Sequence, residues 1–240
     1  MEILKNWGDI GGGLHFLARY GHVLFGIAWI GLLYFFNFVQ VPAYAELSAG
    51  ARVEAFDKVT WRALWWFRMA ALATFVTGVI MWGVAGSDYK DQALLSIAWG
   101  SILATTMFLN VWGVIWVNQK INITSLRTEG KPNADAAKKA ARASRANALF
   151  SIPMLFFMVF TTHFSGRYEA ASGGKLVTVW IIFLALWAFI EANALGLVGG
   201  LDSPFNKLVF DKHQNTIIAG VVYWLVLLIL CWEIIIGGIS

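Results

Sequence analysis

Two aromatic residues of the first apolar run could hold a flat, metal-containing group. His22 lies near the start of this run, and Trp29 follows seven residues later. Residues seven apart share one face of an α-helix, so an imidazole and a large ring would lie on the same side. Such a face could lie against a macrocycle, and it would also suit a neighbouring helix.

The elements that must position these residues are membrane-spanning helices. Hydrophobic residues make up 59% of the chain and charged residues 13%, against about 45–50% and about 25% in soluble domains. Runs of roughly 17–25 apolar residues can cross a bilayer. Six fall at about 20–41, 64–84, 94–117, 148–164, 176–198 and 216–236. The sequence therefore predicts an all-α integral membrane protein, a bundle of about six transmembrane helices forming one membrane domain over 1–240.

Polar and proline residues predict how the spans end and connect. Pro42 is expected to end the first span, and Pro153 should kink the fourth. Segment 118–147 is predicted to be a cytoplasmic basic loop and helix, with Asn133 as the helix cap. Its basic residues would be solvated or would contact anionic lipid or an acidic partner. These are Lys138, Lys139, Arg142 and Arg145.

The distribution of basic residues predicts the orientation. Twelve Lys and Arg residues follow the first, third and fifth spans, and five lie on the other side. The positive-inside rule places the first set in the cytoplasm. Both termini would then lie on the outer, periplasmic side of a bacterial inner (cytoplasmic) membrane. A nucleic-acid-binding surface is not predicted.

This orientation brings two histidines to a common depth. His22 lies near the outer end of the first span, and His163 lies in the last turn of the fourth. Two imidazoles at matched depth on different helices are what a bis-histidine b-type haem requires. Arg19 and Arg167 could then meet its propionates at the outer surface. Cys231 is the lone cysteine, so the chain has no C-x-x-C-H site for covalent haem.

A second polar group is predicted nearer the cytoplasmic side. Arg68 lies early in the second span, Asn110 in the third and Glu191 in the fifth. Ionisable residues inside spans usually face the bundle interior and pair with one another. We therefore expect Arg68 and Glu191 to form an ion pair beside Asn110. This group would bind a polar substrate, relay protons or lock the helices together.

Several motifs together resemble the membrane domain of bacterial cytochrome-c-dependent urate oxidases, the urate oxidase N-terminal family. They are Arg19-x-x-His22, Ala28-Trp29-Ile30-Gly31, Trp65-Trp66-Phe67-Arg68, Thr77-Gly78, Asn110-Val-Trp112, Arg145-x-Asn147, Ser151-x-Pro153 and Met158 leading to His163. The spacing of His22 and Trp29 alone also resembles HemJ-type protoporphyrinogen oxidase, whose family binds b haem at such a histidine.

The resemblance to the urate oxidases implies a membrane oxidoreductase that passes electrons outward. With no c-type haem motif in the chain, we expect a separate periplasmic cytochrome c as the acceptor. If the reaction is the hydroxylation of a purine such as urate, the catalytic site would consist of Arg68, Asn110 and Glu191. The alternative from another class is a non-catalytic accessory subunit of a larger respiratory or photosynthetic membrane complex. A transporter is disfavoured, because the spans show no paired, symmetric breaks.

Overall fold

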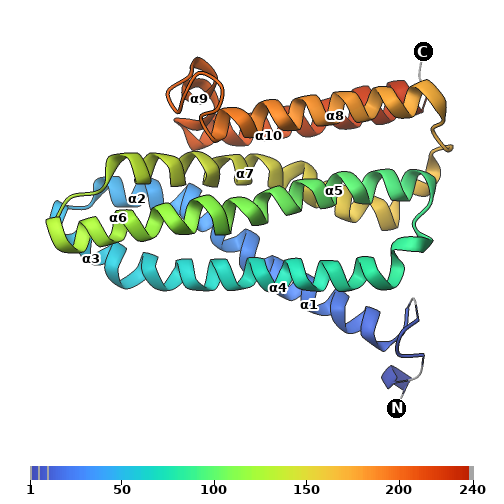
Figure 1. Cartoon of the computed structure of the whole chain (residues 1–240), viewed down its shortest axis with the longest axis horizontal. Coiled ribbons are helices and arrows are strands. Elements are labelled where there is room, and N and C mark those ends of the chain that lie inside the picture. The colour runs from blue at the N-terminus through green and yellow to red at the C-terminus, as the bar shows by residue number, and fades with distance from the viewer. Residues whose placement is uncertain (1, 5, 10, 238–240) are drawn as a thin grey trace.

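Six long apolar helices dominate the structure, which is a computed structural model (Figure 1). It describes residues 2–4, 6–9 and 11–237, and this part of the chain is helical with short connections. The helices long and apolar enough to cross a membrane are Gly13–Glu46, Ala49–Ala85, Asp91–Glu129, Ala134–His163, Gly173–Ala194 and His213–Ile236. The six predicted spans and the membrane class are confirmed.

Four of the six spans combine α-helical and π-helical segments. The first joins α1 (Gly13–Tyr34) through Phe35–Gln40 to α2 (Val41–Glu46), and the second joins α3 (Ala49–Ala55) through Phe56–Thr60 to α4 (Trp61–Ala85). The third joins α5 (Asp91–Leu109) through Asn110–Ile115 to α6 (Trp116–Glu129), and the last continues α10 (His213–Leu225) into Val226–Ile236. Segments α7 (Ala134–His163), α8 (Gly173–Ala194) and the short α9 (Pro204–Phe210) are α-helical throughout.

Two predicted boundaries are wrong. Pro42 does not end the first span, which continues to Glu46. It lies in the first turn of α2, directly after a π-helical segment, so the helix continues through a residue that donates no backbone hydrogen bond. In segment 118–147 the predicted helix is present and continues into the fourth span as α7, whereas the residues before it extend α6 to Glu129 where a loop was predicted. Asn133 does cap α7, its side chain accepting from the Ala136 N–H at 3.0 Å.

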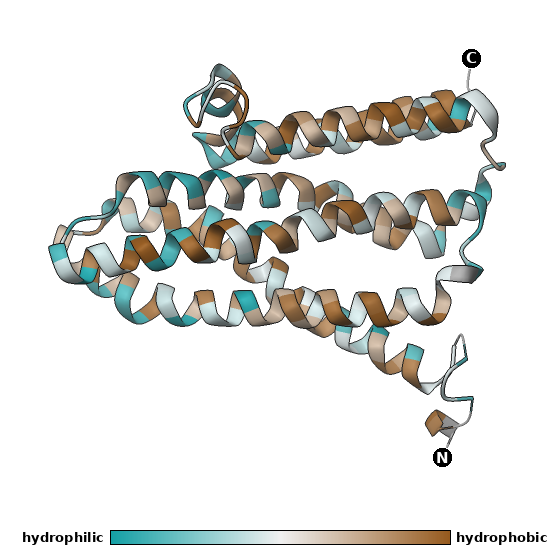
Figure 2. Cartoon of the chain, viewed as in Figure 1, coloured by the Kyte–Doolittle hydropathy of each residue, from teal (hydrophilic) through white to brown (hydrophobic). Residues whose placement is uncertain are grey.

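Helix α7 lies at the centre of the bundle. It packs against α5, α6 and α10, while α1 runs along α4 (Figure 1). Brown hydrophobic residues follow the middle of the helices in Figure 2, and hydrophilic residues gather at the α6–α7 turn. The two ends of the chain lie at the same end of the bundle, opposite this turn (Figure 1).

Pro153 in the middle of α7 shapes the contact with α10. A proline has no N–H, so the carbonyl four residues earlier, that of Leu149, loses its helical partner. Gly220 of α10 packs here: a Cβ on it would lie 3.0 Å from the Leu149 carbonyl oxygen and 2.7 Å from Cδ1 of Ile152. Glycine is therefore required for α10 to lie this close to α7.

The basic residues at the start of α7 bind the connection that contains α9. Arg142 is 5% exposed and donates to the carbonyls of Leu201 and Asn206 and to Asp211 Oδ1, at 3.2, 3.2 and 2.6 Å. Arg145 donates to the carbonyl of Phe210.

Lys138 extends this contact at the surface. Its Nζ lies 2.8 Å from Asp202 Oδ2, and this hydrogen bond lowers the pKa of the Asp202 carboxyl. Lys139 is exposed. Three of the four basic residues therefore hold the chain's own α8–α10 connection, rather than being free for lipid or solvent as expected.

Candidate functional site

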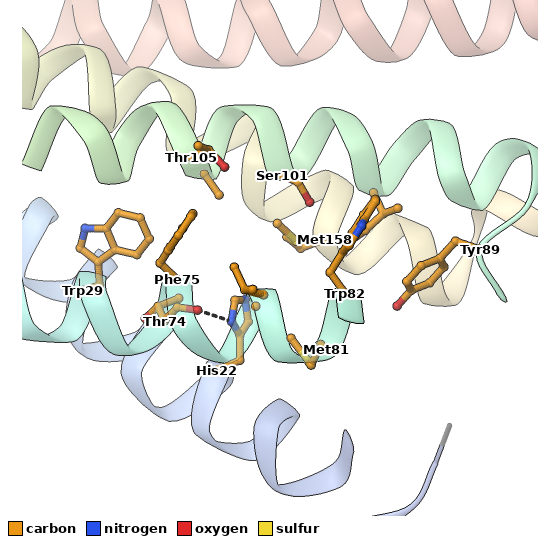
Figure 3. A pocket seen from close by; sticks show the side chains of 14 residues that line it. His22, Trp29, Thr74, Phe75, Met81, Trp82, Tyr89, Ser101, Thr105 and Met158 are labelled. Atoms are coloured by element: carbon orange, nitrogen blue, oxygen red, sulfur yellow. Dashed lines mark hydrogen bonds between the residues drawn. The ribbon is translucent and has the colours of Figure 1, made fainter. Parts of the chain in front are cut away.

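A cavity lies between the α1–α4 pair and the α5–α7 pair. Its volume is about 240 Å³, and its lining is mostly apolar. The walls carry one imidazole, several aromatic rings, two thioethers and a few hydroxyls (Figure 3). The lining residues are His22, Trp29, Thr74, Phe75, Gly78, Val79, Met81, Trp82, Tyr89, Ile97, Ser101, Ala104, Thr105 and Met158.

His22 is held in one tautomer by the neighbouring helix. Its Nδ1 lies 2.8 Å from the carbonyl oxygen of Thr74 on α4 (Figure 3) and 3.3 Å from Thr77 Oγ1. A carbonyl oxygen can only accept, so Nδ1 carries the proton and donates it. Nε2 then keeps its lone pair, and the hydrogen bonds that His22 makes with the described residues all use Nδ1. Nε2 is therefore the imidazole nitrogen that can accept a hydrogen bond or bind a metal.

Gly78 makes room for this imidazole. A Cβ at Gly78 would lie 3.1 Å from Cε1 and 3.5 Å from Nδ1 of His22. A side chain there would push the ring away from the Thr74 carbonyl. By contrast, a Cβ at Gly83, further along α4, would meet nothing within 4 Å.

Trp29 lies in the same cavity, as predicted from its spacing to His22. It is 2% exposed, and its Nε1–H has no hydrogen-bond partner among the described residues. A buried donor without a partner costs free energy, and in Figure 3 this nitrogen lies on the side of the indole away from His22 and the other lining residues.

The other residues expected around a haem lie elsewhere. His163 is exposed at the end of α7 and is not part of the lining of this cavity. Arg19 is exposed beside His15, with 3.3 Å between Nη2 and Nε2. Arg167 is exposed too, with its guanidinium 5.5 Å from the centroid of the Phe164 ring. Arg19 lies about one turn before His22 on α1, and none of these three residues is part of the cavity lining.

The predicted polar group is partly assembled. Asn110 Nδ2 donates to Glu191 Oε2 at 3.2 Å and to Asn147 Oδ1 at 3.0 Å. Asn147 in turn donates to the carbonyl of Met107 at 2.9 Å. Asn110 begins the π-helical segment Asn110–Ile115, a feature that is frequent at functional sites. Sequence reasoning found Asn110 and Glu191 and gave Asn147 no role.

The ion pair expected between Arg68 and Glu191 is wrong: it is not among the salt bridges of the described residues. The Arg68 guanidinium instead lies over two indole rings, 3.9 Å from the centroid of Trp116 and 4.9 Å from that of Trp112. The faces of these rings attract a cation, and the Nε of Arg68 has no hydrogen-bond partner among the described residues.

Comparison with known proteins then decides the family. A model described as urate oxidase N-terminal matches residues 67–192, slightly more than half of the chain. The chain belongs to the urate oxidase N-terminal family. No match was found among curated proteins or among solved structures.

The segment that matches the urate oxidase N-terminal family supplies most of the site. It contains Arg68, Asn110 and Glu191, together with Gly78 and Met158. The α1 residues His22 and Trp29 precede it. The cavity of this family member is therefore formed by α1 together with helices α4, α5 and α7, which the matched segment contains in whole or in large part.

Proposed function

We propose that this member of the urate oxidase N-terminal family is a membrane redox protein in which His22 ligates a b-type haem. The observation that carries the proposal is the hydrogen bond from His22 Nδ1 to the Thr74 carbonyl, 2.8 Å long. Histidines that bind metal usually donate their other ring N–H to a carbonyl or carboxylate. His22 has this arrangement, and its ring lines an apolar cavity.

The residues of the cavity suit a flat, largely apolar group. Aromatic walls offer stacking. The volume of about 240 Å³ lies below the roughly 300–1,000 Å³ of pockets for drug-sized ligands. A haem is larger than this volume, so its binding requires flexible wall side chains such as Met158 and Trp82 to change rotamer.

A b-type haem held at His22 would supply one-electron oxidation and reduction. The chain's own part is to hold the imidazole in one tautomer, to exclude water with apolar walls and to keep the ring plane fixed through Thr74 and Gly78. Arg19 and Arg167 are the proposed partners for the haem carboxylates, although neither is part of the cavity lining.

The network of Asn110 and Glu191 is the proposed site of proton chemistry. Asn110 follows the cavity residue Thr105 by five positions, about 7.5 Å along the helix axis. Hydroxylation of a purine such as urate takes one oxygen atom from water and releases two protons and two electrons. Glu191 would accept a proton from that water, with Asn110 orienting the carboxylate. Arg68 would contribute positive charge, and the electrons would leave to a separate periplasmic cytochrome c.

The proposed location is a bacterial inner membrane with both termini outward. The basic residues that follow the first, third and fifth spans support this, because Lys and Arg accumulate on the cytoplasmic side. Under this orientation His22 lies towards the periplasm, the side from which a soluble cytochrome c would collect electrons.

Difference spectroscopy of the purified protein tests the proposal. We expect a b-type band in the reduced-minus-oxidised spectrum of the wild type, lost in His22→Ala and kept in His213→Ala, whose histidine lies outside the cavity. A wild type without a b-type band overturns the haem assignment. A band that survives in His22→Ala removes His22 as the ligand. Co-purification in a stable larger assembly, with full function in His22→Ala, would instead support the accessory-subunit alternative.

A further inference from the structure

Two positively charged side chains lie over the same indole where α4 packs against α6. The Arg68 guanidinium of α4 lies 3.9 Å from the centroid of Trp116. Lys120, one turn further along α6, places its Nζ 5.6 Å from that ring. The two charges are therefore no farther apart than these two distances together. Like charges repel more strongly where water is partly excluded, so an anion between them would be stabilised.

Neither cation has a counter-ion in the described part of the chain. Arg127 lies over the neighbouring Trp61 at 4.9 Å and is paired with Asp57 at 2.6 Å. By contrast, Arg68 and Lys120 are not among the salt bridges of the described residues. Of the guanidinium nitrogens of Arg68, only Nε is enclosed without a partner. Its Nη1 and Nη2 are therefore accessible, and a guanidinium can donate from such a pair to two oxygens of one anion.

These charges lie at the level of a membrane–water interface. Trp65 and Trp66, two and three residues before Arg68, are exposed, and indoles collect at the level of the lipid headgroups. Lys120 is exposed as well, on the side of the polar α6–α7 turn (Figure 2). Under the proposed orientation this is the cytoplasmic leaflet, whose anionic lipids attract Lys and Arg.

A strip of three aromatic rings leads from Arg68 towards the apolar middle of the bundle. The guanidinium lies 4.9 Å from the centroid of Trp112, and the Trp112 ring lies 6.2 Å from that of Phe108. Phe108 in turn stacks on Phe75, with 4.3 Å between centroids. All three rings are half-buried. A pair of cations joined to an apolar strip fits an amphiphile better than a free anion.

We propose that this surface binds an anionic phospholipid, with its phosphate between Arg68 and Lys120 and an acyl chain along the aromatic strip. The inference goes beyond the proposed function and needs no haem. A lipid bound here would offset the positive charge that Arg68 is proposed to supply near Glu191. It would therefore oppose that reaction rather than take part in it.

Lipid binding to the purified, delipidated protein in detergent tests the inference. Native mass spectrometry measures the affinity for phosphatidylglycerol, with phosphatidylcholine as the zwitterionic comparison. Lys120→Gln and Arg68→Gln each remove one of the two charges. Lys131→Gln is the matched control, because it removes another exposed charge at the same end of the bundle. Lys120 is exposed, so Lys120→Gln should keep the unfolding midpoint of the wild type.

We expect the wild type to bind phosphatidylglycerol more tightly than phosphatidylcholine. Each variant of the pair should bind phosphatidylglycerol about fivefold more weakly, the effect of one basic residue near an anionic surface, and Lys131→Gln should bind it as the wild type does. Inorganic phosphate at the same concentration should not displace the lipid. Equal affinity for the two lipids, unchanged affinity in Lys120→Gln, or displacement by inorganic phosphate overturns the inference. The b-type band is measured separately and tests only the proposed function.

Discussion

The side-chain amide of Asn147 determines which way that of Asn110 faces. Asn147 Nδ2 donates to the carbonyl of Met107 at 2.9 Å, and a carbonyl can only accept. The side-chain oxygen of Asn147 must therefore face Asn110, whose Nδ2 donates a hydrogen bond to it at 3.0 Å. That same nitrogen reaches Glu191 Oε2 at 3.2 Å. A backbone carbonyl on the third span thus orients a carboxylate on the fifth.

Asn147→Ala should destabilise the protein. It leaves one side-chain N–H of Asn110 without its acceptor and removes one of the two donors to the Met107 carbonyl, and a buried unpaired polar group costs about 1–3 kcal/mol. A lower midpoint of thermal unfolding in detergent would show this. Asn118→Ala is the control, because Asn118 is half-buried and donates only to Val114 of its own helix. Equal effects from the two variants would argue against the network.

Replacements of Glu191 should distinguish its contribution to stability from its proposed role as a proton acceptor. Glu191→Gln keeps an oxygen for Asn110, so its unfolding midpoint should match the wild type. Glu191→Leu removes that acceptor and should lower the midpoint. If Glu191 accepts a proton in the reaction, Glu191→Gln should nevertheless lose most urate-dependent reduction of cytochrome c. Full activity in Glu191→Gln would exclude this role.

If His22 binds a haem as proposed, Gly78→Ala should weaken that binding while leaving the fold intact. The new Cβ would lie 3.1 Å from His22 Cε1, and overpacking of this kind typically costs about 1–3 kcal/mol. About 1.4 kcal/mol corresponds to a tenfold loss of affinity, so haem content per protein should fall after dialysis. Gly83→Ala meets nothing within 4 Å and should retain full haem content. If both variants retain it, Gly78 is not required for the His22 orientation.

Arg142→Ala should release the connection between α8 and α10. Three oxygen acceptors of this connection would lose their donor, so limited proteolysis should cut residues 195–212 faster. Arg142→Lys should restore little of the resistance to proteolysis, because a lysine ammonium group cannot reproduce the planar set of N–H donors of a guanidinium. The neighbouring exposed Lys139→Ala serves as the matched control. Unchanged cleavage in Arg142→Ala would show that other contacts hold the connection.

The spans could be predicted from the sequence because hydrophobic length is a local property. Depth in the membrane follows from the spans, which is why Asn110 and Glu191 were correctly grouped. Rotation about the helix axis does not follow from depth. Arg68 shares the expected level of Glu191 and yet turns towards Trp112 and Trp116.

Hydrogen bonds to backbone atoms of another helix also cannot be predicted from the sequence. The acceptor that fixes His22 is the carbonyl of Thr74, on another helix, and no side-chain type marks it. Gly78 and Met158 belonged to the motifs of the family resemblance, but their roles depend on how α1, α4, α5 and α7 pair. The hydrogen bonds of Arg142 likewise depend on where the α9 connection folds back.

The packing of Gly220 against Leu149, whose carbonyl Pro153 leaves without a helical donor, has a consequence for how relatives of this chain can diverge. The proline leaves the Leu149 carbonyl without its helical partner, and the glycine lets α10 pass beside it. A larger residue at position 220 would meet both that oxygen and Ile152, so it is tolerable only with a changed α7. The two positions should therefore vary together among homologues, and a chimaera that exchanges one helix without the other should assemble poorly.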